Sequence, residues 1–313
     1  MSKLIFDSHL AIAQLDNETL DKLKSGLTFR LSKEILDKIL DSKFKFPFHQ
    51  INPLYPEVIR VGLDTSSGYV FPTGLIRHVL GILPKDKEKR TSNYKPSDKP
   101  VKLNLRDYQR EALGYCLNNY RGIVKIPTGG GKTFIEGELC NQLHKARIII
   151  TVPTISLLYE IQSKISNMTG EEIGLIGDGN WDKSHRITVA IPKSLISRSS
   201  SLKSWLGSLD VWIADEVHKL SNRTGWEISA LLHFCRYRIG FSATPCINPI
   251  LYGMFGPIIY LLKEESSFDK GLIERPIIKI YESPTSPHYH PRASRKCRNM
   301  RQYNSLYKTV ILD

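Results

Sequence analysis

Residues 122–133 read Gly-Ile-Val-Lys-Ile-Pro-Thr-Gly-Gly-Gly-Lys-Thr, and this stretch decides the fold of the chain. Its apolar, β-branched start at 122–126 predicts a buried strand, and the residues from Lys132 onward favour a helix. Glycines between the two allow a tight turn that points backbone N–H groups inward. A strand, a glycine-rich turn and a helix in this order predict a phosphate cradle within an α/β fold.

The turn offers groups suited to a nucleoside triphosphate and its metal ion. The ammonium of Lys132 can reach the β- and γ-phosphate oxygens, and the hydroxyl of Thr133 can ligate Mg²⁺, so we expect ATP and Mg²⁺ as cofactors. The candidate cofactor-binding residues here are Pro127, Thr128, Gly129, Gly130, Gly131, Lys132 and Thr133. Ile126 stands where the pattern G-x-x-x-x-G-K-[ST] has its first glycine. The alternative, a glycine-rich turn with a solvated lysine, is disfavoured by the flanking strand and helix.

Two carboxylates end a second predicted strand, in the run Asp-Val-Trp-Ile-Ala-Asp-Glu-Val-His at 210–218. In phosphoryl transfer, Asp215 would hold Mg²⁺, usually through water, and Glu216 would orient or deprotonate the attacking water. An Asp-Glu pair at a strand end is in isolation more often a solvated turn. Its position about 80 residues after the phosphate loop favours the catalytic interpretation.

Two further segments belong to the same candidate site. Ser242 and Thr244 follow the predicted strand at 237–241, although a serine-threonine turn before a proline would be ordinary on its own. Upstream, Gln109 has the amide geometry to bind adenine at N6 and N7, while Arg106 or Tyr108 could stack on the ring. A polar helix start is the alternative for that segment.

The rest of the chain divides by pattern and composition. From Leu105 onward, short strands alternate with helical stretches, which predicts a mostly parallel sheet. Residues 1–83 carry helical patterns and a hairpin pattern, and we expect a small α+β domain that recognises substrate. Residues 84–103 are rich in charge and proline, and we expect a charged linker there. We place the ATP-binding domain at 104–280 and a basic linker at 281–313.

Charge and hydropathy limit the partners. The chain has 44 Lys and Arg against 31 Asp and Glu, a formal net charge of +13, which favours a partner with a phosphate backbone or an anionic surface. We see no run of about 20 apolar residues and no signal peptide, and therefore expect no membrane partner and a cytoplasmic protein, in the host cytoplasm if a phage encodes it. Five scattered cysteines suggest neither a disulfide framework nor a zinc site.

In order and spacing, these motifs resemble those of superfamily 2 DExH helicases. The matching segments read LRDYQ, PTGGGKT, TVPTISLL, DEVH and FSATP. Within that superfamily, the stretch at 251–280 and the SGYVFPTGLIRHV stretch at 67–79 look like phage UvsW-type branch-migration helicases and the related XPB group. The resemblance implies a RecA-like P-loop domain with a mostly parallel sheet at 104–280, preceded by a small α+β domain.

The resemblance also implies roles and partners. It makes the chain part of an ATP-dependent DNA helicase or translocase that remodels forks or Holliday junctions. The catalytic candidates are then Glu216, Asp215, Lys132, Ser242, Thr244 and His218, with the last three linking hydrolysis to DNA movement. The nucleic-acid-binding candidates are Pro153, Thr154, Lys193 and Ser194. We expect a monomer that binds branched or single-stranded DNA, with RNA as a possible ligand.

One departure from the family is large. Such helicases need a second RecA-like lobe that carries an arginine finger, and the basic residues at 292–301 are a poor substitute. We therefore expect the chain to end as the second lobe would begin and to be weakly active alone. Two alternatives stay open: a nucleic-acid-binding module with a regulatory nucleotide site, and the motor subunit of a restriction system.

Overall fold

The computed structural model describes residues 3–6, 10–30, 49–51, 58–79, 81–82, 101–245, 249–263, 278–282 and 308–312. The chain divides into two compact units, residues 1–263 and 264–313, which we describe separately. Among the described residues, no helix has both the length and the apolar character needed to cross a bilayer.

The first unit begins with two small antiparallel sheets and a helix. One sheet has the strand order β1-β2-β7-β6 and the other β3-β5-β4. The elements are β1 (Lys3–Phe6), β2 (Leu10–Gln14), α1 (Asn17–Gly26), β3 (Thr28–Arg30), β4 (His49–Ile51), β5 (Val58–Val61), β6 (Leu63–Thr65), β7 (Gly68–Pro72) and η1 (Thr73–Val79). The helical pattern at 17–27 forms α1, and the hairpin pattern at 58–75 includes the β6–β7 hairpin. A second helical pattern, at 31–41, lies outside the described residues.

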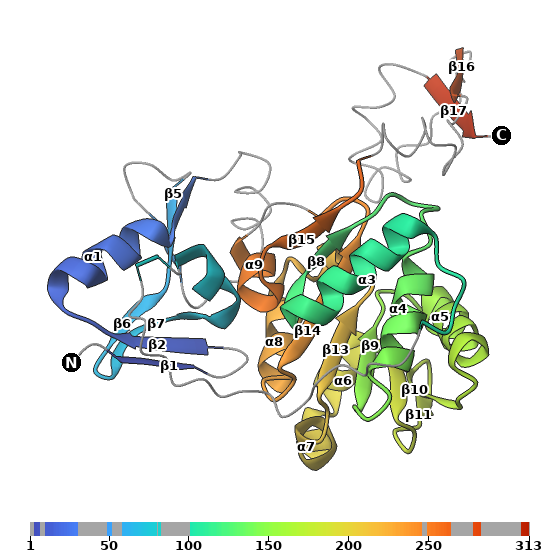
Figure 1. Ribbon diagram of the computed structural model, residues 1–313, viewed down its shortest axis with the longest axis horizontal. Coiled ribbons are helices and arrows are strands. Elements are labelled where there is room, and N and C mark those ends of the chain that lie inside the picture. The colour runs from blue at the N-terminus through green and yellow to red at the C-terminus, as the bar shows by residue number, and fades with distance from the viewer. Residues whose placement is uncertain are drawn as a thin grey trace, which may run out of the picture. The chain divides into compact units, whose positions relative to one another are not determined.

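A sheet of eight strands dominates the rest of this unit (Figure 1), in the order β11-β10-β12-β9-β13-β14-β8-β15. The strands are β8 (Arg121–Lys125), β9 (Ile148–Thr151), β10 (Ile173–Gly177), β11 (Asn180–Trp181), β12 (Ile187–Ala190), β13 (Val211–Ala214), β14 (Tyr237–Ser242) and β15 (Ile258–Leu261). All adjacent pairs are parallel except β10 with β11. The central strands β9, β12, β13 and β14 are buried throughout, as expected for a parallel sheet covered on both faces.

Helices connect these strands and cover the sheet. They are α3 (Asp107–Asn119), α4 (Lys132–Gln142), α5 (Ile155–Thr169), α6 (Pro192–Ser197), α7 (Ser199–Gly207), η2 (Val217–Leu220), α8 (Arg223–Leu231) and α9 (Pro249–Phe255). Helix α4 packs on both α3 and α5, while α8 packs on α6 and α9. Figure 1 shows α3, α4 and α5 in front of the strands. The predicted α/β class with a mostly parallel sheet is confirmed.

The N-terminal elements contact the large sheet domain through a close approach of two backbones. In η1, a Cβ added to Gly74 would lie 2.1 Å from the carbonyl oxygen of Tyr252 and 2.5 Å from that of Gly253, both in α9. Nearby, the Arg77 guanidinium donates to the side-chain and backbone oxygens of Asn119, at 2.6 and 3.2 Å. Only a residue without a side chain fits at position 74 in this arrangement.

In the second unit, β16 (Ile278–Glu282) and β17 (Lys308–Leu312) pair antiparallel. The basic linker predicted over 281–313 thus includes a strand, and its residues 283–307 lie outside the described part of the chain. So does most of the charged linker predicted at 84–103, of which the structure describes only 101–103. The domain boundaries therefore stay predictions.

Candidate functional site

The loop after β8 has the geometry of a phosphate cradle. Gly129 and Gly131 adopt φ values of 80° and 73°, in the region that favours glycine. A Cβ on Gly130 would lie only 2.5 Å from the side chain of Ile126. Helix α4 begins at Lys132, directly after this turn. Its free N–H groups and the positive end of its dipole therefore face the space above the loop, which suits an anion.

The beginning of α3 holds this loop in place. The Tyr108 hydroxyl donates to the Gly130 carbonyl at 2.8 Å, and Gln109 Nε2 donates to the carbonyls of Gly130 and Gly131, both at 3.3 Å. Gln109 Oε1 in turn accepts from the backbone N–H of Arg106 at 2.9 Å. The Gln109 amide thus uses both its ends on protein groups, and its adenine-binding role stays a prediction.

The two carboxylates lie at the carboxyl edge of the sheet, after β13. The Glu216 backbone N–H donates to Asp215 Oδ1 at 2.8 Å, and Glu216 has a φ of 46°. A non-glycine residue with this left-handed backbone conformation is strained by about 1–3 kcal/mol, and such strain is often found at functional turns. Lys132 Nζ lies 3.6 Å from Glu216 Oε1. The structure therefore brings the phosphate-loop lysine and the candidate water-orienting carboxylate together.

Burial sets the ionisation of Asp215, which is 7% exposed. Desolvation raises the pKa of this carboxyl, and the negative charge of Glu216 raises it further, while the Glu216 N–H and the Lys132 charge oppose the rise. A divalent cation beside Asp215 would favour its ionised form.

His218 and Ser242 join the carboxylate turn to the end of β14. His218 Nδ1 lies 2.8 Å from Ser242 Oγ and 3.3 Å from Glu216 Oε2. The backbone N–H of Thr244 donates to the same Ser242 oxygen at 3.1 Å. Burial lowers the pKa of His218, although Glu216 opposes this, so the ring is neutral near pH 7. Because an anionic oxygen faces Nδ1, the tautomer that carries its proton on Nδ1 is favoured.

The residues present fit Mg²⁺ bound together with a triphosphate. A hydroxyl from Thr133, in the first turn of α4, and the carboxylate of Asp215 are hard oxygen ligands of the kind that Mg²⁺ prefers. Across the described residues, no group of three or more His, Cys, Asp or Glu side chains could hold a metal ion by itself. Phosphate oxygens and water would therefore supply the remaining ligands, which is usual for Mg²⁺.

The predicted nucleic-acid contacts follow the neighbouring strands β9 and β12. Thr154 caps α5, with its hydroxyl accepting from the Leu157 N–H at 3.3 Å, and Pro153 precedes it. Lys193, which is exposed, and Ser194 begin α6. Since β9 and β12 pair parallel, both segments lie at the same carboxyl edge of the sheet as the phosphate loop. The basic residues at 292–301 lie outside the described residues.

Sequence reasoning missed two buried glutamates on α4. Glu136 and Glu138 are both 0% exposed. Glu138 accepts hydrogen bonds from the backbone N–H groups of Lys102 and Leu103, at 2.9 and 3.0 Å. Neither oxygen of Glu136 has a hydrogen-bond partner among the described residues, and burial raises its pKa well above the ordinary value. The sequence pattern that could have indicated Glu136 is a carboxylate four residues after Lys132, about one turn farther along the same helix.

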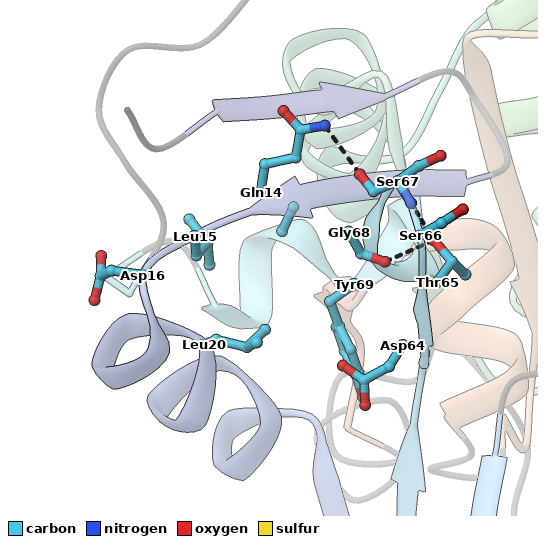
Figure 2. Close-up of a pocket in the computed structure, with 11 residues that line it drawn as sticks. Gln14, Leu15, Asp16, Leu20, Asp64, Thr65, Ser66, Ser67, Gly68 and Tyr69 are labelled. Atoms are coloured by element: carbon cyan, nitrogen blue, oxygen red, sulfur yellow. Dashed lines mark hydrogen bonds between the residues drawn. The ribbon is translucent and has the colours of Figure 1, made fainter.

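A hollow with a volume of about 510 Å³ lies on the N-terminal part of the chain (Figure 2). It lies between the end of β2 and the β6–β7 hairpin, where Gln14 donates to the Ser67 carbonyl at 3.0 Å. Among the described residues its lining includes Asp16 and Asp64 and no lysine or arginine, although Lys24 Nζ lies 2.8 Å from Asp64 Oδ1. The two carboxylates make this hollow a less suitable site for a phosphate backbone than the loop before α4.

The chain is similar to known proteins in both sequence and fold. The family described as "Type III restriction enzyme, res subunit" matches residues 102–247. A DNA 3'-5' translocase XPB2 from Sulfurisphaera tokodaii is 35% identical over 192 residues, which cover 59% of this chain and 42% of that protein. The ATP-dependent DNA helicase uvsW of Enterobacteria phage T4 is 24% identical over 183 residues, 53% of this chain and 36% of its own length. The chain thus covers less than half the length of these two relatives.

Solved structures extend the similarity beyond the matched sequence. A crystal structure of the UvsW helicase from bacteriophage T4 aligns with a TM-score of 0.61 at 18% identity, over 83% of this chain and 99% of that one. A second T4 UvsW structure aligns with a TM-score of 0.60 at 18% identity, over 84% of this chain and 57% of its own. At this identity the likeness concerns the fold. Taken with the phosphate loop and the carboxylate turn, these similarities show that the chain resembles superfamily 2 helicases of the UvsW and XPB type.

Proposed function

We propose that this chain binds ATP and Mg²⁺ and forms the ATP-binding part of a DNA helicase or translocase that remodels branched DNA. The observation that carries the proposal is the contact chain from Lys132 through Glu216 and His218 to Ser242. Four residues from three separate segments of sequence meet there at one edge of a parallel sheet, where such folds bind nucleotides.

The residues at this site have distinct roles in hydrolysis. The ammonium of Lys132 neutralises charge on the β- and γ-phosphates. Thr133 and Asp215 would hold Mg²⁺, which would supply Lewis-acid stabilisation of the negative charge on the phosphates. Glu216 orients the attacking water and accepts its proton. Because Lys132 Nζ lies 3.6 Å from Glu216 Oε1, we infer that a triphosphate on the loop would compete with Glu216 for the lysine and free the carboxylate for this role.

The hydroxyl of Ser242 couples ATP hydrolysis to movement along DNA in this proposal. His218 contacts both Glu216 and Ser242, so a change at the γ-phosphate alters the hydrogen bonds at the end of β14. Thr244 is tied to the same oxygen. The chain then leads into α9, which contacts η1 of the N-terminal part. We infer that this connection transmits the nucleotide state to the predicted substrate-recognition domain at 1–83.

DNA would run over the carboxyl edge of β9 and β12, against Pro153, Thr154, Lys193 and Ser194. Contacts of this kind bind the backbone without reading bases, and their affinity falls steeply with salt. The formal charge of +13 is consistent with such a partner. We propose that the protein acts as a monomer in the cytoplasm, on branched or single-stranded DNA.

Turnover is proposed to need a second RecA-like lobe. An arginine finger contributes about 10³- to 10⁵-fold to such reactions, and closure of two lobes excludes water from the nucleotide. We therefore expect this chain to bind ATP but to hydrolyse it slowly. A longer protein that adds a second lobe should show DNA-stimulated ATPase and unwinding.

The test combines binding and turnover. ATP–Mg²⁺ should raise the Tm of the 313-residue chain, and four-way DNA should stimulate the longer protein more than single-stranded DNA does. Removal of residues 1–100 should leave the ATP shift intact and abolish the preference for four-way DNA. Robust DNA-stimulated turnover by the purified monomeric chain would contradict the need for a second lobe. A chain that binds DNA without any ATP shift would instead be a nucleic-acid-binding module.

A restriction motor is the second candidate, favoured by the family that matches residues 102–247. Such a motor would work together with a nuclease, and it would have no preference for branched over linear duplex DNA. Equal stimulation of the longer protein's ATPase by linear duplex and four-way DNA would favour this candidate over fork remodelling.

A further inference from the structure

We propose that Phe134 stacks on the base of the bound nucleotide and supplies affinity for the purine ring. The inference rests on the proposed function, since it assumes that a triphosphate lies on the loop before α4. It adds a base-binding residue that the motif patterns did not single out. The proposed ligand class is a purine nucleoside triphosphate.

The first observation is exposure at the rim of the phosphate loop. Phe134 is 47% exposed although it lies two residues after Lys132, in the first turn of α4. Its two successors along the helix, Ile135 and Glu136, are both fully buried. A single exposed phenylalanine is ordinary on a protein surface. This one differs because it stands beside the place where a phosphate would bind.

The second observation is the position of its ring over the loop. A Cβ built on Gly131 would lie 3.5 Å from Phe134 Cδ2 and 2.4 Å from Gln109 Nε2. The phenylalanine ring and the beginning of α3 therefore both border Gly131. A nucleoside that extends from phosphates on this loop toward α3 would pass the exposed ring.

The third observation concerns the residues first considered for the base: Gln109 and Tyr108 are buried, whereas Arg106 is exposed and stays a candidate beside Phe134. The Gln109 amide is 4% exposed and bonded to loop and helix backbone at both ends. Tyr108 is 9% exposed, and its hydroxyl is bonded to Gly130. Of the aromatic side chains at this rim among the described residues, Phe134 is the one that presents a large exposed area. A ring face attracts a base by stacking, and the two fused rings of a purine offer it more area than the single ring of a pyrimidine.

The test separates base binding from phosphate binding. Equilibrium titration of the 313-residue chain with ATP–Mg²⁺, GTP–Mg²⁺ and tripolyphosphate–Mg²⁺ gives three Kd values for each variant. In Phe134→Ala, we expect the Kd for ATP and GTP to rise by about tenfold or more, and that for tripolyphosphate to stay unchanged. Phe134→Tyr should retain the parent values. The matched control is Phe234→Ala, which alters a phenylalanine that is 56% exposed before β14, at the opposite edge of the sheet.

A spectroscopic signature tests stacking directly. In Phe134→Trp, ATP should quench the added indole fluorescence and tripolyphosphate should not, with the parent and its four tryptophans as the baseline. Equal changes in the affinities for ATP and tripolyphosphate in Phe134→Ala, or no change in either, would overturn the role of Phe134. A parent chain that binds neither ligand would overturn the proposed function and this inference with it. A parent that binds both equally well would overturn the inference alone.

Discussion

His218 Nδ1 lies 2.8 Å from Ser242 Oγ, although the two residues belong to different strand ends of the large sheet. The same nitrogen lies 3.3 Å from Glu216 Oε2, so one imidazole contacts both the candidate water-orienting carboxylate and the segment that leads to α9. Burial lowers the pKa of His218, so protonation of this ring is disfavoured in the folded chain.

The free energy of unfolding should therefore decrease at acidic pH because of His218. Its folded pKa lies below its ordinary value of 6.5, so the unfolded chain takes up a proton first as pH falls. The contribution of the neutral ring is complete above about pH 6.5 and is lost progressively below it. Urea unfolding from pH 5 to 8 should show the parent losing stability relative to His218→Gln as pH falls. A stability difference that stays constant with pH would contradict this account.

Lys132→Ala should leave the chain folded and remove its stabilisation by ATP–Mg²⁺. The ammonium is the main side-chain charge on the β- and γ-phosphates, and its contact with Glu216, at 3.6 Å, contributes little to the fold without nucleotide. Thermal shift with and without ATP–Mg²⁺ measures the effect. Lys145→Ala is the control, since this exposed lysine lies after the far end of α4. An ATP shift in Lys132→Ala equal to that of the parent would refute the phosphate role.

Variants of the two adjacent carboxylates, Asp215 and Glu216, should differ in how much Mg²⁺ increases their affinity for ATP. Asp215→Asn should abolish the gain in ATP affinity that Mg²⁺ gives, because it removes a metal ligand. Glu216→Gln should retain that gain, and should slow hydrolysis in a longer protein with a second lobe, because it removes the base. Titration of each variant with ATP, with and without Mg²⁺, measures this gain in affinity. If Glu216→Gln also lost the Mg²⁺ effect, the two roles would be wrongly assigned.

Replacing the buried glutamates of α4 by methionine should have opposite effects. Glu136→Met should raise the Tm near pH 7, because it removes a buried carboxyl without a partner among the described residues. In the folded parent chain, the pKa of Glu136 lies well above the ordinary value of 4.5. The parent therefore loses stability as pH rises above about 4.5, and the gain in stability of Glu136→Met over the parent should grow with pH.

Glu138→Met is the matched control on the same helix. It should destabilise the chain by at least about 2 kcal/mol, because two backbone N–H groups lose their acceptor. Thermal and urea unfolding at several pH values compare the two variants. Destabilisation by Glu136→Met at neutral pH would contradict this account and show that the Glu136 carboxyl stabilises the fold.

Gly74→Ala should loosen the contact between η1 and α9. The added Cβ would lie 2.1 Å from the Tyr252 carbonyl oxygen, so one of the two backbones must move. Limited proteolysis should then cut faster between the N-terminal part and the sheet domain. Gly114→Ala is the control, because a Cβ there has nothing within 4 Å and alanine stabilises a helix by about 1 kcal/mol. Unchanged proteolysis in Gly74→Ala would show that this contact does not hold the two parts together.

Much of the site could be predicted from the sequence. The strand before the phosphate loop, the turn itself and the helix from Lys132 follow from local pattern, and so do the strand ends at Asp215 and Ser242. A parallel sheet brings the carboxyl ends of its strands to one edge. Residues far apart in sequence could therefore be assigned to one site before their contacts were known.

The contacts themselves were decided by tertiary structure. Sequence alone determined which elements form, where they end and which residue types stand at those ends, because these depend on neighbours along the chain. Only the packed structure decided that Gln109 bonds to the loop, that Glu216 faces Lys132, that Glu136 is buried without a partner in the part of the chain that the structure describes, and that Gly74 meets α9. These outcomes depend on how separate helices and strands approach one another in three dimensions, to within a few tenths of an ångström, and no local pattern encodes that distance.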